Sequence, residues 1–592
     1  MSKILLAQLL FTLYLSDVLI PVAVATLQEN GCEKNDRKKP HIIIILADDL
    51  GWNDVSFHGS NQIPTPNIDA LAYNGVILNR HYVLPICTPS RAALMTGKYP
   101  IHTGMQHAAL DPSEPRGLPL NETILPQFLK EANYATYIVG KWHIGYYKHE
   151  YTPCFRGFDT CFVCWNGFQD YFSHDTAELN TPNKGIDMRR NMTISWDTRG
   201  KYVTDLYTEE AIHLINNHNI DDPMFLYLSY TAPHSAGVEH SLQAPPEEIE
   251  KFTYINDKKR RIYAAMVSKL DQGVGNVIEA LKNRSMLENS IIVFMSDNGA
   301  PTNGFLANHG SNYPFRGIKD TAWEGAVRGV AAVWSPLVKN SKRVSNDLMH
   351  ITDLSPTLLT VAGVKEINGK DGKNMWETIK YGKLNPRNEV LININDIFHY
   401  EAIINVTDEN VMYKYVRGQA PLTSNWVGDS GRNPSEKQPP YLPATVLDSK
   451  AGAAIATVTT SNNKSALIAQ DILRLRQEAT VHCNVMKENK ARNCTWSKPC
   501  LFDLKRDPCE KINIIEQEPN VAKNLQEALN KYRSKMLPPN NKFKDWEASP
   551  FWWNRTWVCW QDPNQQHEFI NIFFTFLYYF VPTVAYFLSL SF

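Results

Sequence analysis

The feature that most constrains the fold is a continuous run of β-branched residues near the N-terminus, His41-Ile42-Ile43-Ile44-Ile45-Leu46. Apolar and polar residues do not alternate in this run, which predicts a strand buried on both faces. Comparable runs follow at 134–139, 224–230 and 291–295. Amphipathic segments at 205–218 and 260–282 predict helices between them. The sequence therefore predicts an α/β fold with helices on both faces of a parallel or mixed sheet.

Each of these four predicted strands runs into polar residues. They are Asp48 and Asp49 after the first, Lys141 and His143 after the second, His234 after the third, and Asp297 and Asn298 after the fourth. Ligands of α/β sheets bind beyond the carboxyl ends of the strands. We therefore expect the four separated motifs to converge on one crevice.

Asp48, Asp49, Asp297 and Asn298 offer only oxygen as a ligand atom. A carboxylate-rich, all-oxygen set selects a hard cation such as Ca²⁺ or Mg²⁺ over zinc. An isolated Asp-Asp pair is more often a solvated loop or a helix cap, but two such sets at the ends of buried strands favour a metal site. Lys141 and His143 are two residues apart and would share a face on extended backbone.

The run Cys87-Thr88-Pro89-Ser90-Arg91 predicts an extended entry, a tight corner and a short helix. Pro89 suits the first turn of a helix, where its missing N–H costs nothing. A side chain at position 87 would lie where free N–H groups and the helix dipole favour an anion. Arg91 is one turn further on and could reach back toward Cys87. A bare C-x-P-x-R pattern leaves another interpretation open, in which a buried free cysteine lies beside a surface arginine.

This pattern resembles the signature of the type I sulfatases. The surrounding runs at 48–54, 85–91 and 104–106 look most like the subgroup of arylsulfatase B (N-acetylgalactosamine-4-sulfatase) and its close relatives. The resemblance covers roughly residues 40–540. It implies an alkaline-phosphatase-like large mixed sheet sandwiched by helices, with a smaller C-terminal domain built on a short antiparallel sheet. We expect a catalytic domain over 38–385 and a smaller C-terminal subdomain over 386–545, which includes a helix over 520–536.

The resemblance also implies a set of functional residues. Cys87 would be oxidised by the formylglycine-generating enzyme to formylglycine, an aldehyde whose hydrate is the nucleophile. One Ca²⁺ would be bound by Asp48, Asp49, Asp297, Asn298 and the modified Cys87. The implied catalytic residues are Cys87, Arg91, Lys141, His143, His234 and Lys319, and of these Arg91, Lys141, His234 and Lys319 also bind the substrate. His240 lies near His234 in an apparent local insertion.

The implied mechanism has a physical logic. A sulfate ester is anionic, so the cationic side chains and the metal would cradle its oxygens. One hydroxyl of the hydrate, activated by the metal and Asp297, would attack sulfur, while His234 with Lys319 protonates the leaving oxygen. The second hydroxyl, deprotonated with help from His143, would then expel sulfate, a step for which serine lacks a hydroxyl. We expect sulfated sugars as substrates, specifically N-acetylgalactosamine 4-sulfate at the non-reducing ends of glycosaminoglycans.

The N-terminus indicates the secretory pathway. Residues 1–26 contain Lys3, an apolar run and a small-residue end, as in a cleaved signal peptide. N-x-S/T sequons follow at Asn121, Asn191, Asn283, Asn405, Asn463, Asn493 and Asn554. Ten cysteines in this context predict disulfides, at most four within the chain if Cys87 is reserved for chemistry. Cys161-x-x-Cys164 fits disulfide use better than half a zinc site, since no second pair accompanies it.

The chain ends in an uncharged stretch over 569–592, which is long enough to span a bilayer. We expect it to anchor the enzyme to a membrane, although sulfatases of this subgroup do not generally need such a tail. A removable lipid-anchor signal and a packed core segment are the alternatives. The expected location is therefore lysosomal, or membrane-anchored with the catalytic domain extracellular.

The net charge of −1 argues against a nucleic-acid partner. Three other functions compete with the main hypothesis. A phosphatase or phosphodiesterase of the same superfamily would use Ser or Thr and usually two zinc ions, which Cys87 argues against. A catalytically inactive protein that binds sulfated glycans would have lost a catalytic position, and none is lost here. A sulfatase acting on another sulfate ester is the third.

Overall fold

The computed structural model describes residues 38–237, 241–304, 306–365, 367–418, 438–461, 465–483 and 494–563. The predicted signal peptide, the hydrophobic segment at 569–592, His240 and the sequons at Asn463 and Asn493 lie outside the described residues.

A ten-stranded mixed sheet forms the centre of the fold, with strand order β13-β2-β12-β11-β1-β10-β4-β5-β8-β9. At its middle, β1 (His41–Ala47) pairs in parallel with β11 (Ser290–Ser296) and β10 (Met224–Ser229), and β10 pairs in parallel with β4 (Ala135–Lys141). The other strands are β2 (Val76–Leu78), β5 (Thr160–Cys164), β8 (Arg189–Arg190), β9 (Thr193–Ile194), β12 (Ala331–Trp334) and β13 (Arg343–Ser345). The four expected strands are thus neighbours in one sheet.

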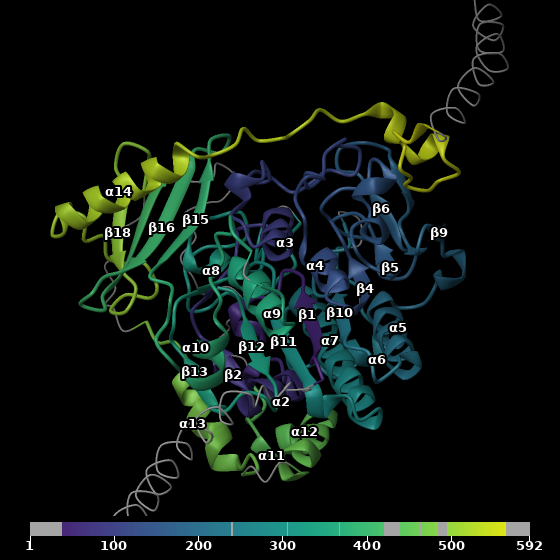
Figure 1. Cartoon of the computed structure of the whole chain (residues 1–592), viewed down its shortest axis with the longest axis horizontal. Helices are drawn as coiled ribbons and strands as arrows, with labels where there is room; N and C mark the ends of the chain where they lie inside the picture. The colour runs from purple at the N-terminus through teal and green to yellow at the C-terminus, as the bar shows by residue number, and fades with distance from the viewer. Residues whose placement is uncertain are drawn as a thin grey trace, which may run out of the picture. The chain divides into compact units, whose positions relative to one another are not determined.

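Helices cover both faces of this sheet (Figure 1). One face packs against α2 (Pro66–Asn74), α5 (Val203–Asn217) and α7 (Lys258–Asn283). The other packs against α3 (Cys87–Thr96), α4 (Leu125–Glu131), α9 (Leu354–Val361) and α10 (Trp376–Tyr381). Successive residues of β1 alternate between the two cores, with Ile43 and Ile45 in one and Ile42 and Ile44 in the other. The predicted α/β sandwich is confirmed.

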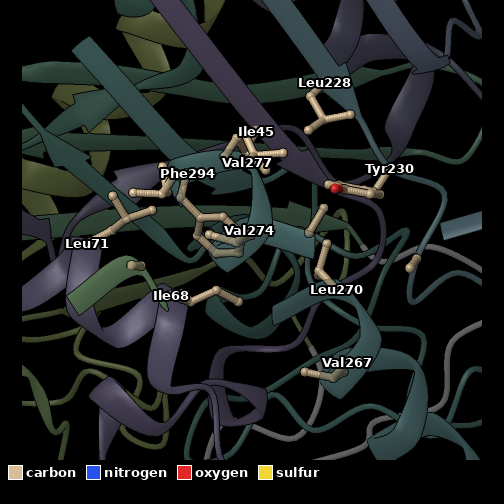
Figure 2. Close-up of a cluster of buried hydrophobic side chains, with 14 of the residues drawn as sticks. Ile45, Ile68, Leu71, Leu228, Tyr230, Val267, Leu270, Val274, Val277 and Phe294 are labelled. Atoms are coloured by element: carbon tan, nitrogen blue, oxygen red, sulfur yellow. The ribbon is translucent and has the colours of Figure 1, made fainter. Parts of the chain in front are cut away.

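Figure 2 shows part of the first core. Ile45, Leu228 and Phe294 come from three adjacent strands and face Val274 and Val277 of α7. All five side chains have at most 1% of their surface exposed. Burial of one such side chain stabilises the fold by about 1.5–3 kcal/mol, so this core fixes the strands whose ends carry the site.

Three helices that the sequence analysis did not anticipate also pack on this face. They are α11 (Pro443–Leu447), α12 (Lys450–Ser461) and α13 (Ala469–Ala479). Ile455 of α12 and Leu475 of α13 are fully buried in the first core. The alanines of α12 favour a helix, but its Gly, Thr and Val residues weaken that preference, so tertiary packing contributes to its stability.

The smaller antiparallel sheet is confirmed and has the strand order β15-β16-β17-β18. Its strands are β15 (Glu389–Asn395), β16 (Tyr400–Val406), β17 (Met412–Gly418) and β18 (Cys500–Asp503). Helix α14 (Pro519–Arg533) lies beside this sheet (Figure 1). Its Leu525 and Leu529 belong to one buried cluster with Leu391 and Ile403 of the sheet. Two further sheets have two strands each. They pair β14 (Met349–His350) with β3 (His81–Tyr82) and β6 (Asp175–Ala177) with β7 (Lys184–Ile186). The short helices α6 (Pro246–Glu250) and α8 (Glu324–Val327) complete the α-helices and strands described.

The described residues contain three disulfides, Cys154–Cys161, Cys483–Cys509 and Cys494–Cys500. Cys161 is therefore bonded to Cys154, while Cys164 is free and buried, as are Cys87 and Cys559. Across the described ranges, none of the helices combines the length and the apolar character needed to cross a membrane.

Candidate active site

The carboxyl ends of β1, β4, β10 and β11 lie on one edge of the sheet because these strands are parallel neighbours. The structure brings the expected side chains together at this edge and adds the N-terminus of α3 to them. Cys87, Asp48, Asp49, Arg91, Lys141, His143, His234, Asp297 and Asn298 are all less than 5% exposed. Lys319 comes from the segment between β11 and α8 and is 11% exposed.

Arg91 connects several of the strand ends. Its Nε and Nη2 lie 3.1 and 2.8 Å from Oδ2 of Asp297, and its Nη1 lies 2.6 Å from the hydroxyl of Ser229. A further bond joins Nη1 to the carbonyl oxygen of Lys141. The expected reach of Arg91 back toward Cys87 is thus replaced by hydrogen bonds to the strands, which use the fork geometry of the guanidinium.

Two more ion pairs neutralise the other carboxylates. Lys141 Nζ lies 2.7 Å from Oδ2 of Asp48, and Lys319 Nζ lies 2.8 Å from Oδ1 of Asp49. Burial alone would raise the pKa of Asp48, but attraction to Lys141 and to other cations outweighs it and lowers that pKa below its usual value. For Asp297, burial and repulsion from Asp48 prevail over the nearby cations and raise the pKa.

The oxygen atoms of this cluster fit a hard divalent cation. Asp48 Oδ1 and Asn298 Oδ1 are buried and have no hydrogen-bond partner among the described residues. Asp48 Oδ1 has only a 3.5 Å ion pair with Arg91 Nη2. Buried oxygens normally accept a hydrogen bond, so two that accept none close to further carboxylates indicate a ligand. Ligand atoms of Asp48, Asp49 and His234 also lie within 4.8 Å of one another.

Cys87 is the first residue of α3 and is 2% exposed. Burial raises the pKa of its thiol, although Lys141 and Lys319 oppose the shift. The thiolate is the reactive form of cysteine, so the unmodified side chain is a poor nucleophile at neutral pH.

His143 follows the end of β4 with a left-handed backbone, φ 61°. The extended backbone on which Lys141 and His143 were expected to share a face therefore stops before His143. Its Nε2 lies 3.0 Å from the carbonyl oxygen of Leu110, which can only accept, so Nε2 carries a proton. Burial, and then repulsion from Lys141, lowers the pKa of His143 well below its usual range. The neutral ring leaves the lone pair of Nδ1 as a proton acceptor, with no partner among the residues described.

His234 has the opposite arrangement. Its Nδ1 donates to the carbonyl oxygen of Ser235 over 2.7 Å, and its Nε2 lies 3.3 Å from Lys319 Nζ. Burial lowers the pKa of His234, whereas Asp49 raises that of Lys319 far enough to exceed the penalty of burial. Lys319 is therefore the protonated member of this pair and donates to the neutral imidazole.

The sequence analysis missed three residues that support the site. Asn308 Nδ2 donates to the carbonyl oxygens of Asp49 and Pro233, which ties the loops after β1 and β10 together. The ring of Phe168 stacks on that of His234 with an interplanar angle of 5°. A Cβ atom at Gly167 would come within 2.5 Å of the His143 ring. Gly167 and Phe168 lie in the glycine- and aromatic-containing loop after β5, and that composition is the only sequence signal for them. No local signal points to Asn308.

Comparisons with known proteins agree with this geometry. Residues 40–364 match the model of the family described as Sulfatase. Arylsulfatase J of Mus musculus is 36% identical over 527 residues, which cover 88% of this chain and 80% of the mouse protein. N-acetylgalactosamine-6-sulfatase of Homo sapiens is 32% identical over 372 residues, covering 59% of this chain and 67% of that protein.

A solved structure shares the fold of this chain. The crystal structure of Ps i-CgsB in complex with k-i-k-neocarrahexaose aligns with a TM-score of 0.64 and 26% sequence identity. The alignment covers 90% of this chain and 99% of the other. The family match, the relatives and the shared fold thus agree, and the chain belongs to the sulfatase family of sulfuric ester hydrolases.

Proposed function

We propose that this sulfatase uses a formylglycine made from Cys87 and one bound Ca²⁺ to remove sulfate from N-acetylgalactosamine 4-sulfate at the non-reducing ends of glycosaminoglycans. The observation that carries the proposal is the convergence of Cys87 with three cationic side chains and an unsatisfied set of buried oxygens. A site of this kind suits a nucleophile that attacks an anionic ester.

Asp48, Asp49, Asp297, Asn298 and the modified residue 87 would bind the cation. When bound, the cation supplies positive charge for the sulfate oxygens, and formylglycine supplies a hydrated aldehyde as the nucleophile. The thiol of Cys87 is protonated and buried, which supports a modified rather than a native side chain at this position.

The chain's own side chains divide the remaining work. Arg91, Lys141 and Lys319 orient the sulfate by charge. Lys319 holds a proton beside Nε2 of His234, so this pair provides the proton for the leaving oxygen. Nδ1 of neutral His143 accepts a proton when the site is regenerated. His143 is thus the base and the His234–Lys319 pair is the acid.

Two positions of the sulfate ester on the sugar are candidates, the 4-sulfate and the 6-sulfate. The runs around Asp48 and Cys87 support the 4-sulfate through their resemblance to the arylsulfatase B subgroup. The relationship to N-acetylgalactosamine-6-sulfatases favours the 6-sulfate of the same sugar as the second candidate. Both candidates share the sulfated N-acetylgalactosamine end.

The test is the rate of sulfate release from defined oligosaccharides that end in N-acetylgalactosamine 4-sulfate, N-acetylgalactosamine 6-sulfate or glucosamine sulfates. We expect the 4-sulfated end to have the highest kcat/KM, with Cys87→Ala as the inactive control. Faster release from the 6-sulfated end would replace the substrate, and a preference for glucosamine sulfates would reject both candidates.

The protein would act in the lysosome or outside the cell, held to a membrane by residues 569–592. The exposure of the sequon residues Asn121, Asn191, Asn283 and Asn554 supports glycosylation in the secretory pathway. Fractionation of cells that express the full chain or a chain ending before 569 tests the anchor. If both forms are equally soluble, the anchor is rejected.

A further inference from the structure

We propose that a cleft outside the catalytic centre binds an additional stretch of a sulfated glycan, and so holds long substrate chains on the enzyme. The cleft has a volume of about 930 Å³, at the upper end of the range for small-molecule sites. None of the catalytic or metal-binding residues described above lines it. The inference rests on the proposed function, in which the substrate is a sulfated glycan.

Two segments far apart in the sequence form the walls of the cleft. One contains β6, β7 and the turn at Trp196, and the other runs over 546–555. The amide of Ile186 in β7 donates to the carbonyl oxygen of Arg555 over 2.8 Å, and Trp557 Nε1 donates to the carbonyl oxygen of Thr176 in β6. Figure 1 shows this C-terminal segment beside β6. Because hydrogen bonds join the two segments, the cleft is a built feature of the fold.

Aromatic rings provide the surface of the cleft. Trp196, Trp546 and Phe551 are 45%, 56% and 69% exposed, and all three line it. Trp552 packs edge-on against both Trp546 and Phe551. Clustered large aromatic side chains on a hollow surface mark a binding site, and their flat faces suit the apolar faces of sugar rings.

The charge of the cleft selects an anionic ligand. Lys184, Arg199 and Arg555 line it, and Asp175 is the one acidic residue among the described residues of its lining. Asp175 already forms an ion pair with Arg199, which leaves an excess of positive charge. Sulfate groups on a sugar chain complement this charge.

The cleft is also connected to the catalytic centre. The loop after β5 packs Gly167 against His143 and Phe168 against His234, and it then continues directly into β6. One loop thus contacts two catalytic side chains and leads into a wall of the cleft, so a glycan long enough to occupy both sites would be held on the enzyme. Such tethering raises the effective concentration of chain ends without a new contact at the reacting atoms.

A saccharide fits better than the other two conceivable occupants. A lipid surface is flat, whereas this site is hollow and places Asn183 and Ser549 among its aromatic rings. The chain's own N-glycan is the third occupant, because Asn554 belongs to a sequon and lines the cleft. The experiment includes variants that separate these three cases.

The test compares Trp196→Ala and Phe551→Ala with the control Trp496→Ala. Trp496 is also exposed, but it contacts Arg417 of the smaller sheet and does not line the cleft. Each full-length variant is assayed on long dermatan sulfate chains and on the small ester 4-methylumbelliferyl sulfate. We expect KM for the long chains to rise about tenfold in the two cleft variants, the effect of losing about 1.4 kcal/mol of binding. Their kcat, their KM for the small ester and all values for Trp496→Ala should stay within twofold of the wild type.

Unchanged KM for long chains in folded cleft variants would overturn the proposal, and so would equal losses on both substrates. Loss of binding to anionic phosphatidylserine vesicles with unchanged glycan kinetics would assign the surface to a membrane instead. A lower melting temperature in Trp196→Ala that Asn554→Gln reproduces, with glycan kinetics unchanged, would assign the cleft to the N-glycan at Asn554.

A binding measurement separates this proposal from the proposed function. In a Cys87→Ala background, a 4-sulfated dermatan decasaccharide should quench tryptophan fluorescence, and its Kd should rise about tenfold when Trp196→Ala is added. This result would support the cleft even if the wild type hydrolysed no glycosaminoglycan. Hydrolysis of the chains with a Kd that is the same with and without Trp196→Ala would reject the cleft alone.

Discussion

Lys414→Met should destabilise the protein by removing the cation that bridges two carboxylates of a buried cluster, which joins the small sheet to the catalytic segment around Lys319. Within the described residues, Lys414 Nζ lies 2.9 Å from Glu324 Oε1 and 2.8 Å from Glu510 Oε1, and all three side chains are fully buried. Glu510 Oε2 also accepts from the amide of Glu324, and its carbonyl oxygen accepts from Arg316. The variant would leave two buried carboxylates without this partner.

Removal of one partner from a buried ion pair costs about 3–5 kcal/mol, because an uncompensated charge remains in a medium of low polarity. We expect a loss of that size at pH 8 in the free energy of unfolding, measured by urea denaturation and tryptophan fluorescence. Lys450→Met is the matched control, since Lys450 is 54% exposed in its ion pair with Glu279. It should cost less than about 1 kcal/mol.

The pH dependence of the loss follows from Glu510. Burial raises its pKa to about 7, and attraction to Lys414 limits that rise. Without Lys414 the pKa rises further, so the folded state retains a proton on Glu510 at mildly acidic pH. The destabilisation should therefore be larger at pH 8 than at pH 5. Equal losses for Lys414→Met and Lys450→Met at pH 8 would refute this reasoning.

Three further predictions follow from the site and its surroundings. Arg91→Lys keeps the charge but loses the forked contact with Asp297 and Ser229, so kcat should fall about 100-fold or more at constant melting temperature. A loss in kcat of less than tenfold would contradict the role of the fork. Gly167→Ala would bring a methyl group into contact with the His143 ring and displace it, so kcat should fall by up to about 100-fold in a folded protein. Wild-type activity in this variant would show that the position of the ring is unimportant. Burial raises the pKa of Asp69 to about 6 and that of Asp271 to about 7, so the stability that these two carboxyls contribute is lost as the pH rises from 5 to 8. Asp271→Asn removes one of these contributions, so the melting temperature of the wild type minus that of the variant should fall over this range, and a difference that stays constant or rises would contradict the assignment.

The fold was largely predictable from the sequence because its central strands carry an unambiguous signal. The run from His41 to Leu46 leaves no polar face, and the structure buries alternate residues of β1 in two separate cores. Helix α12 was not predicted, because its Gly, Thr and Val residues weaken the helical preference of its alanines and packing against the first core stabilises the helix.

Within the site, sequence reasoning located the polar strand ends but not their pairing. Asp49 and Lys319 are 270 residues apart, and no local pattern indicates that they form an ion pair. The left-handed backbone of His143 and the support that Asn308 gives to two loops also depend on long-range contacts. Side-chain partners across separate loops are set by tertiary structure, which a single sequence does not encode in its local spacing.

The most direct test of the central claim is the mass of the tryptic peptide 81–91, which contains residue 87, from enzyme secreted by a eukaryotic host. The measurement is made on the preparation whose rate of sulfate release is known. We predict an aldehyde in place of the Cys87 thiol, in a fraction of molecules that rises in proportion to the specific activity. A fully active preparation in which residue 87 is an unmodified cysteine would contradict the account.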